Sequence, residues 1–327
     1  MKKKILIIVL ALVILGGAIA FPFVRFMVDP KDTEEFYRAG VSLGYNANTI
    51  ETAVPQTELY NMIKNHFESP LTEGKTEKKA IIIGYDGCRA DVLKLSEGGI
   101  KYLVDGGNST YFAYCGGVNY PEKNTQDTST APGWCSILTG VWADKHGVTA
   151  NDITKSMEYK TLLTSLVEDK TIDSSSFITK WKGHFDRENA TYLGEKAYCE
   201  ENNLNVSFNR CDDDKASLDF TLNEIGKKDC ADFLFVIYEQ TDSAGHNTGF
   251  TYNNPKYRNA FIEMDNYGLE TIKAIEARET YDTEDWLIII TADHGGIGTG
   301  HGGDSIQERM TFYITNKDSK KKLTTSN

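Results

Sequence analysis

Four uninterrupted hydrophobic runs constrain the fold of this 327-residue chain more than any other feature. They occupy residues 80–84, 111–114, 233–238 and 286–291, and a further candidate strand occupies residues 311–314. Hydrophobic residues that continue without alternation indicate strands that are covered on both faces, as in a parallel sheet.

Stretches with helical character lie between these runs. Strands that alternate with helices are typical of α/β domains, so the sequence predicts a doubly wound, mostly parallel sheet with helices on both faces. The helical stretches are residues 90–103, 133–138, 216–225 and 256–277, and two earlier helical patches are residues 34–42 and 57–66.

The composition excludes several classes of protein. The hydrophobic fraction of 40% and the charged fraction of 25% are ordinary for a globular chain, and they exclude a mostly disordered protein, a coiled coil and a polytopic membrane protein. The net charge of −12 argues against nucleic-acid binding, which normally uses a basic surface. Acidic side chains also bind hard cations, so the charge is compatible with a metal site.

The N-terminus carries a targeting pattern. Lysines at positions 2–4 precede an uncharged run at residues 5–24, which as a helix would span about 30 Å, the thickness of a bilayer core. Two interpretations fit: an uncleaved signal anchor, or a signal peptide cleaved after Ala18-Ile19-Ala20. We favour the anchor because the hydrophobic character continues past Ala20 to Val24. A buried core helix fits less well, since three lysines before so long a charge-free run are atypical of one.

Both export interpretations place residues from about 30 onward outside the cytoplasm, so the protein is expected to be anchored in a membrane there or secreted. We expect an anchor or signal segment at 1–28, a spacer and covering segment at 29–78, and one large α/β domain at 79–327. The polar residues near 150–230 are expected to form an irregular insert over the site.

Cysteine usage is compatible with export. No pair of cysteines has the Cys-x-x-Cys spacing of a thiolate zinc site. Cys199 and Cys211 flank a short polar segment and are the best candidates for a disulfide. The six cysteines are Cys88, Cys115, Cys135, Cys199, Cys211 and Cys230.

Carboxylates and histidines follow three of the hydrophobic runs. Ligands of open α/β sheets gather beyond the carboxyl ends of the strands. A single Asp after a strand is more often a cap, and a single His in a Gly-rich loop is usually structural, but several strand ends that converge on such residues favour a metal site. Imidazole together with carboxylate suits zinc. The residues are Asp86, Asp242, His246, Asp293, His294 and His301.

A hydroxyl residue opens the predicted helix near residue 133. Thr130 precedes Ala131 and Pro132, and Pro is favoured in the first turn of a helix. The free N–H groups of a helix N-terminus can hold an anion such as phosphate beside the Thr130 hydroxyl. The alternative is that Thr130 is only an N-cap.

Five short motifs occur together in one order. They are Asp-Gly-x-Arg at 86–89, Thr-x-Pro at 130–132, Thr-Gly followed by His-Gly at 139–147, Asp-x-x-x-His at 242–246, and Asp-His-Gly at 293–295. This series resembles the alkaline phosphatase superfamily over residues 78–316, and within it the nucleotide pyrophosphatase/phosphodiesterase branch. The resemblance implies an alkaline phosphatase-like fold.

The resemblance also implies a site with two zinc ions, or Mn²⁺ or another divalent metal in their place. One ion would be held by Asp86, Thr130, Asp293 and His294. The other would be held by Asp242, His246 and His301. The Asn151 amide and the Ala131 N–H would bind phosphoryl oxygens, although a turn residue would explain Asn151 nearly as well.

The implied chemistry is hydrolysis of a phosphodiester or pyrophosphate bond through a phosphothreonine at Thr130. The substrate would be a small phosphodiester or a nucleotide. A phosphomonoesterase or a phospho-head-group transferase of the same superfamily is the main alternative, and a non-enzymatic binding protein is a further one. A sulfatase is disfavoured because sulfatases place Cys or Ser at the nucleophile position.

Some residues depart from the family pattern or lie outside it. Gly133 and Trp134 stand where diesterases often carry Asn and an aromatic residue or His, so the resemblance does not define the wall of the substrate pocket. His146 fits the pattern but is expected either to be structural or to contact one of the metal ligands. His66 and His184 match no motif and are expected at the surface or in loops.

Overall fold

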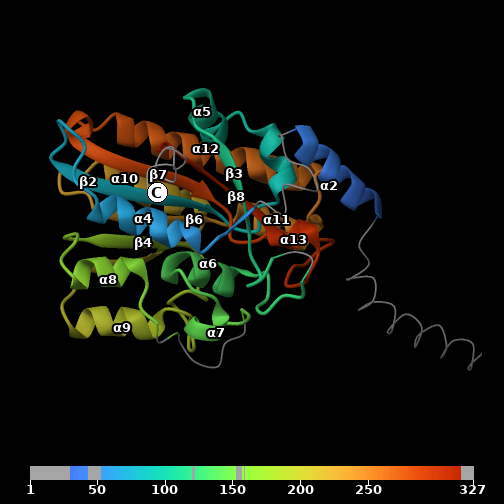
Figure 1. Cartoon of the computed structure of the whole chain (residues 1–327), viewed down its shortest axis with the longest axis horizontal. Coiled ribbons are helices and arrows are strands. Elements are labelled where there is room, and N and C mark those ends of the chain that lie inside the picture. The colour runs from blue at the N-terminus through green and yellow to red at the C-terminus, as the bar shows by residue number, and fades with distance from the viewer. Residues whose placement is uncertain (1–29, 43–52, 120–121, 152–156, 158, 318–327) are drawn as a thin grey trace, which may run out of the picture.

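The computed structural model describes residues 30–42, 53–119, 122–151, 157 and 159–317 (Figure 1). An eight-stranded sheet runs through this part of the molecule in the order β1-β3-β8-β7-β2-β6-β4-β5. The strands are β1 (Val54–Pro55), β2 (Glu77–Tyr85), β3 (Thr110–Tyr114), β4 (Ser175–Thr179), β5 (Val206–Arg210), β6 (Phe233–Tyr238), β7 (Glu284–Thr291) and β8 (Met310–Thr315).

The sheet is mostly parallel. Strand β8 pairs antiparallel with both of its neighbours, β3 and β7, whereas all the other neighbouring pairs are parallel. The five hydrophobic runs of the sequence correspond to β2, β3, β6, β7 and β8, so the predicted fold class and these strands are confirmed.

Helices cover both faces of the sheet. Ile81 and Ile83 of β2 belong to one hydrophobic core, and Ile82 between them belongs to the other. The first core is closed by α5, α10 and α12, and the second by α4, α6 and α8 (Figure 1). These helices are α4 (Glu58–Glu68), α5 (Gly99–Asp105), α6 (Thr130–Thr139), α8 (Leu162–Glu168), α10 (Asp214–Ile225) and α12 (Pro255–Glu276).

The region near 150–230 is not the irregular insert that the sequence suggested. Its described residues contribute β4 and β5 to the sheet, together with α8, α9 (Leu193–Glu201) and α10. Ser175, Ser176 and Thr179 make β4 polar in sequence, yet the whole strand is buried. Hydrophobic patterning therefore missed it.

The predicted helix at 90–103 is divided into two. A 3₁₀ helix, η1, covers Ala90–Leu95, and α5 begins at Gly99. Asp265 of α12 holds the junction, because its carboxylate accepts hydrogen bonds from Ser96 Oγ at 2.6 Å, Gly98 N at 2.9 Å and Ile100 N at 2.9 Å.

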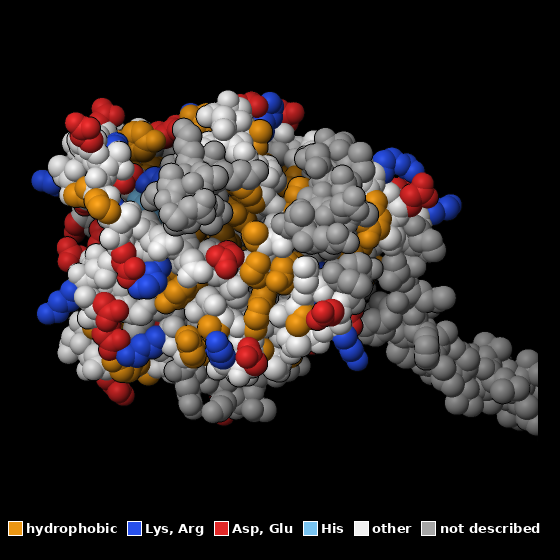
Figure 2. Space-filling model, in the orientation of Figure 1, with side chains coloured by type: hydrophobic (Ala, Val, Ile, Leu, Met, Phe, Trp, Pro, Cys, Tyr) orange, Lys and Arg blue, Asp and Glu red, His pale blue; other side chains and the backbone are white. Residues whose placement is uncertain are grey.

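Helix α2 (Pro30–Ser42) packs against η1, and its Phe36 is fully buried in the first core. Among the described residues no helix is long and hydrophobic enough to cross a membrane, and the predicted anchor or signal segment at 1–28 lies outside them. On the face shown in Figure 2, acidic and basic side chains are interspersed.

The prediction of a disulfide between Cys199 and Cys211 is wrong. Both residues are free thiols, as are the other four cysteines. Cys199 is buried, and its Sγ lies 3.3 Å from Thr164 Oγ1.

Candidate metal centre

The predicted ligands converge at one edge of the sheet. Strands β2, β6 and β7 are adjacent and parallel, so the segments that follow them meet at the same edge. Two sets of ligand atoms each lie within 4.8 Å of one another, and His294 belongs to both. The sets are Asp86, Asp293 and His294, and Asp242, His294 and His301.

Thr130 lies against the first set. Its Oγ1 is 3.4 Å from Asp86 Oδ1 and 3.5 Å from His294 Nε2. The N-cap of α6 is Ser129, whose backbone is extended, and Thr130 is the first residue of the helix. The Thr130 hydroxyl therefore faces the acidic cluster and does not cap the helix.

His246 lies beside Asp242 and His301 of the second set. Both Nε2 atoms lie 3.5 Å from Asp242 Oδ1. Asp242 and His246 come from α11 (Gln240–Thr248), one helical turn apart, and His301 comes from the loop after β7. An i, i+4 pair on one helix face is thus completed by a residue far along the chain.

Two buried carboxylate oxygens in the cluster have no hydrogen-bond partner among the described residues. They are Asp242 Oδ1 and Asp293 Oδ2. Burial, followed by the charge of Glu239, raises the pKa of Asp242 to about 7. Burial also raises the pKa values of Asp86 and Asp293 well above their usual range, and each is raised further by a neighbouring carboxylate.

Carboxylate oxygens without a hydrogen-bond donor, next to imidazole nitrogens at such short separations, fit divalent cations. Burial of negative charge without a partner is costly, and a cation removes that cost. Burial, followed by the charge of His301, lowers the pKa of His294 well below its usual value, which favours the neutral imidazole that metals bind.

Two glycines allow the segments that carry the candidate ligands to approach one another closely. A Cβ on Gly87 would lie 2.8 Å from Asp242 Cβ, and Gly87 has a φ of +61°. A Cβ on Gly133 would lie 2.9 Å from Asp293 Cβ. The departure from the family pattern at Gly133 therefore brings α6 directly onto the loop that carries Asp293.

Trp134 supports the site from beneath and does not form a pocket wall. Its side chain is fully buried and its Nε1 donates a hydrogen bond to Asp86 Oδ2 at 3.1 Å. The ring lies against Gly84 of β2, where a Cβ would come within 2.5 Å of it.

Asn151 lies beside the N-terminus of α6. Its Oδ1 accepts a hydrogen bond from Ala131 N at 2.8 Å, so in this arrangement the Ala131 N–H is taken by Asn151. The Asn151 carbonyl oxygen accepts a hydrogen bond from Arg187 Nη2 at 3.2 Å. Asn151 and Ala131, which were expected to bind phosphoryl oxygens, are thus hydrogen-bonded to each other. The guanidinium of Arg187 lies next to them.

The remaining histidines lie away from the centre. His146 is buried between Ser136 Oγ at 3.2 Å and Val148 N at 3.1 Å, which is a structural position. His66 and His184 were expected at the surface or in loops: His184 lies in a turn after β4, as expected, whereas His66 lies in α4, and both side chains are buried. His66 Nε2 contacts Lys79 O at 3.1 Å.

A group of buried charged residues, which the sequence analysis did not identify, lies next to the candidate metal centre. Glu239 directly follows β6, and its Oε1 accepts hydrogen bonds from Thr179 Oγ1 at 3.0 Å and Trp181 N at 2.9 Å. Burial, followed by the charge of Asp86, raises the pKa of Glu239 to about 8. Lys180 Nζ lies 2.5 Å from Asp214 Oδ2 and stabilises the carboxylates around it. Only the position of Glu239 at a strand end could have signalled this group.

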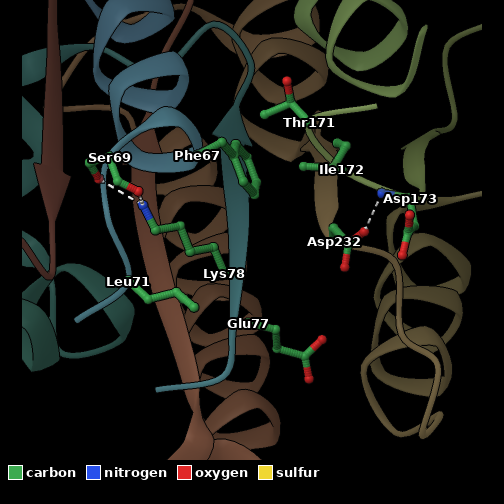
Figure 3. Close-up of a pocket in the computed structure, with 9 residues that line it drawn as sticks. All are labelled: Phe67, Ser69, Leu71, Glu77, Lys78, Thr171, Ile172, Asp173 and Asp232. Atoms are coloured by element: carbon green, nitrogen blue, oxygen red, sulfur yellow. Dashed lines mark hydrogen bonds between the residues drawn. The ribbon is translucent and has the colours of Figure 1, made fainter. Parts of the chain in front are cut away.

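A separate cavity of about 290 Å³ lies at the opposite edge of the sheet (Figure 3). Its lining includes Glu77 and Lys78 at the start of β2, and Asp173 and Asp232 just before β4 and β6. Lys78 Nζ donates to Ser69 Oγ at 2.7 Å, and Asp173 N donates to Asp232 Oδ2 at 2.8 Å. The candidate ligands Asp86 and Asp242 follow the other ends of β2 and β6, so this cavity is not part of the metal centre.

Several solved structures are similar to this chain at low identity. Murine ectonucleotide pyrophosphatase/phosphodiesterase 5, in an inactive form in complex with AMP, is 17% identical with a TM-score of 0.48; the match covers 67% of this chain and 57% of the murine chain. An alkaline phosphatase from the Antarctic bacterium TAB5 is 12% identical with a TM-score of 0.44, covering 74% of this chain and 91% of that one. A lipoteichoic acid synthase from Listeria monocytogenes is 12% identical with a TM-score of 0.46, covering 78% and 71%.

The sequence itself identifies the family. The profile of the type I phosphodiesterase / nucleotide pyrophosphatase family matches residues 80–319, which include all the candidate ligands. This match confirms the resemblance that the motifs carry. The chain belongs to the type I phosphodiesterase / nucleotide pyrophosphatase family.

Proposed function

We propose that this protein is a divalent-metal-dependent hydrolase that cleaves phosphodiester or pyrophosphate bonds through Thr130. The observation that carries the proposal is the position of Thr130 Oγ1, 3.4 Å from Asp86 Oδ1 and 3.5 Å from His294 Nε2. A hydroxyl at a helix N-terminus, beside a cluster of metal-type ligands, is the arrangement expected of an activated nucleophile.

The cluster offers donors for two cations. Imidazole with carboxylate favours zinc, and Mn²⁺ can use the same donors. Bound cations would lower the pKa of the Thr130 hydroxyl and reduce the negative charge of the phosphoryl group. Asp86, Thr130, Asp293 and His294 would hold one cation, and Asp242, His246 and His301 the other.

The reaction would proceed in two displacements on phosphorus. The Thr130 oxygen would form a bond to phosphorus as its proton passes to solvent, and the bond from phosphorus to the substituent oxygen on the opposite side would break, that oxygen taking up a proton from solvent. Water then cleaves the bond between phosphorus and Thr130 Oγ1 and regenerates the hydroxyl. Since the Oδ1 atom of Asn151 accepts from Ala131 N, the side-chain N–H₂ of Asn151 would be the group that donates to a non-bridging oxygen.

The substrate class follows from the family and from the acidic character of the chain. Nucleotides and other small phosphodiesters are the candidates, and nucleic acids are not expected with a net charge of −12. The N-terminal lysines and the hydrophobic run at 5–24 support a position outside the cytoplasm, either attached to the membrane or secreted.

The decisive assay compares two chromogenic esters. We expect faster release of 4-nitrophenol from bis(4-nitrophenyl) phosphate than from 4-nitrophenyl phosphate, loss of activity after chelation, and recovery when zinc is added. Equal rates on the two esters would favour a phosphomonoesterase. Activity that survives chelation would contradict the proposal.

A pair of neighbouring hydroxyl variants tests the nucleophile. Thr130→Ala should lower kcat by about 10³-fold or more while zinc binding is largely retained. Ser129→Ala is the matched control, because Ser129 Oγ is buried without a hydrogen-bond partner among the described residues. An equal loss of kcat in both variants would point to local disruption of α6.

A further inference from the structure

Asp32 of helix α2 joins three segments that lead to the candidate metal centre. Its Oδ2 accepts a hydrogen bond from Arg89 Nη1 at 2.8 Å, and its Oδ1 accepts one from Thr251 Oγ1 at 2.7 Å. Gln307 Nε2 lies 3.4 Å from Asp32 Oδ2. These contacts join residues separated by 57, 219 and 275 positions in the chain.

Arg89 is the buried partner of this carboxylate. It lies three residues after Asp86, and its side chain is fully buried. The guanidinium forms a two-pronged pair with Asp91, through Nε at 3.0 Å and Nη2 at 2.7 Å, and Nη1 also donates to Phe250 O at 2.6 Å. Its stem lies 3.4 Å from where a Cβ on Gly295 would be, next to His294.

Phe250 connects this group to the second set of ligands. Its ring centroid is 5.3 Å from that of His246 and 6.0 Å from that of His301. Its backbone N–H donates to Gly298 O at 2.7 Å, while Arg89 holds its carbonyl oxygen. The backbone of Phe250 is therefore fixed on both sides, and its ring sets where the two imidazoles can lie.

Helix α2 also holds the segment that follows His301. Gln307, in α13 (Ile306–Arg309), donates from Nε2 to Thr33 Oγ1 at 2.8 Å. The next residue, Glu308, accepts a hydrogen bond from Gly295 N at 2.9 Å. One turn of α2 thus contacts α13, which follows the loop that carries His294 and His301, and Glu308 of α13 contacts Gly295 at the start of that loop.

We infer that Asp32 is a positioning residue for the metal subsite formed by Asp242, His246 and His301, and that α2 holds the segments beside this subsite in place. The inference rests on the proposed function. Charge-assisted hydrogen bonds in a buried setting are strong and directional, so losing them loosens what they hold. Because Arg89 would keep its pair with Asp91, removing Asp32 leaves no unpaired buried cation, and the fold should persist.

The test is zinc binding by the full chain, measured by calorimetry and by competition with a chromophoric chelator. We expect Asp32→Ala to weaken one of two zinc sites by about 10-fold or more, the range found when groups behind metal ligands are removed, and to leave the other unchanged. Asp32→Asn keeps one acceptor oxygen and should lose less. Glu34→Ala is the matched control, because Glu34 is exposed on the same helix and pairs with Arg38.

The outcomes separate this inference from the proposed function. If both zinc sites keep their affinity in Asp32→Ala, the inference about Asp32 and α2 is wrong, even if the melting temperature falls. The proposed hydrolase function would be unaffected by that result. Wild-type protein that binds neither zinc nor Mn²⁺ would overturn both. If Asp32→Ala does not fold, Thr251→Val removes only one hydroxyl donor to the same carboxylate, and unchanged zinc affinity in that variant would overturn the inference.

Discussion

The Nε2 atoms of His246 and His301 lie 3.0 Å apart. Each ring places its Nδ1 against a backbone carbonyl, Thr299 O at 3.0 Å and Thr128 O at 3.1 Å. A carbonyl accepts only, so each Nδ1 carries the hydrogen and each Nε2 presents a lone pair. The two Nε2 lone pairs and Asp242 Oδ1 face the same point and therefore repel one another. A cation bound at that point would attract all three atoms.

The first prediction is that zinc stabilises the fold. Zinc at about 100 times its dissociation constant should raise the free energy of unfolding by about 2.7 kcal/mol for each site, because the ligand set does not exist in the unfolded chain. Denaturant unfolding of metal-free protein with and without zinc measures this gain.

His301→Ala should lose the part of the gain that belongs to its subsite. His66→Ala is the control, since His66 is also buried but contacts Lys79 O away from the centre. That variant should be less stable than wild type yet keep the whole zinc-dependent gain. An unchanged unfolding midpoint when zinc is added to wild-type protein would contradict the prediction.

The second prediction concerns the indole beneath Asp86. Trp134→Phe removes the donor to Asp86 Oδ2, so zinc affinity should fall by about 10-fold or more and kcat/KM should fall with it. Trp286→Phe is a closely matched control, because Trp286 is also buried and its Nε1 donates to Glu284 Oε2 at 2.7 Å, away from the site.

Trp286→Phe should lower stability by about 1.5–3 kcal/mol, the contribution of one hydrogen bond to a charged group, since Arg278 Nε still donates to Glu284 Oε2, and leave zinc affinity unchanged. The two quantities are read from denaturant unfolding and from calorimetric titration. Equal effects of both variants on zinc affinity would mean that Trp134 acts only through general stability.

Sequence alone located the candidate ligands because of a property of parallel sheets. The residues after β2, β6 and β7 must lie at one edge, so Asp86, Asp242 and Asp293 could be brought together without a structure. Hydrophobic runs were sufficient for this because these strands are buried on both faces.

The residues that support the candidate ligands could not be found in the same way. Strand β4 reads as polar because Ser175 and Ser176 lie in it, so Lys180 at its end carried no signal. The contact between Asp32 and Arg89 joins residues 57 positions apart with a charge pattern that many other pairs share. Long-range pairing of single charges depends on packing, which periodicity does not encode.

The third prediction tests the close contact between α6 and the loop after β7. Gly133→Ala would place a methyl group 2.9 Å from Asp293 Cβ and 3.0 Å from the Asp293 carbonyl oxygen. Ala is the better helix former, so a loss must come from this contact. We expect a stability cost of about 1–3 kcal/mol and a fall in zinc affinity.

Gly226→Ala provides the comparison at another glycine of a helix end. A Cβ there would meet Leu222 O at 3.4 Å, an ordinary contact, and φ is −71°. Its free energy of unfolding should change by less than about 0.5 kcal/mol. Retention of wild-type zinc affinity by Gly133→Ala would show that Asp293 can shift without consequence.

The fourth prediction concerns acid stability. Burial, followed by the charge of Arg187, lowers the pKa of His184 from 6.5 to about 3, and neither ring nitrogen has a hydrogen-bond partner among the described residues. Between these two pH values the unfolded chain binds a proton that the folded chain does not. The contribution of His184 to stability is therefore present above pH 6.5 and falls as the pH drops, by at most about 1.4 kcal/mol per pH unit.

His184→Phe removes this proton and keeps an aromatic ring beside Phe177, Trp181 and Tyr192. At pH 8 the difference in unfolding free energy between variant and wild type reports packing alone, because the imidazole is neutral in both states. At pH 5 the difference should shift in favour of the variant by about 2 kcal/mol, in the metal-free protein, by urea unfolding. A difference that stays constant from pH 8 to pH 5 would mean that His184 becomes protonated in the folded protein, and hence that water or a partner reaches its ring.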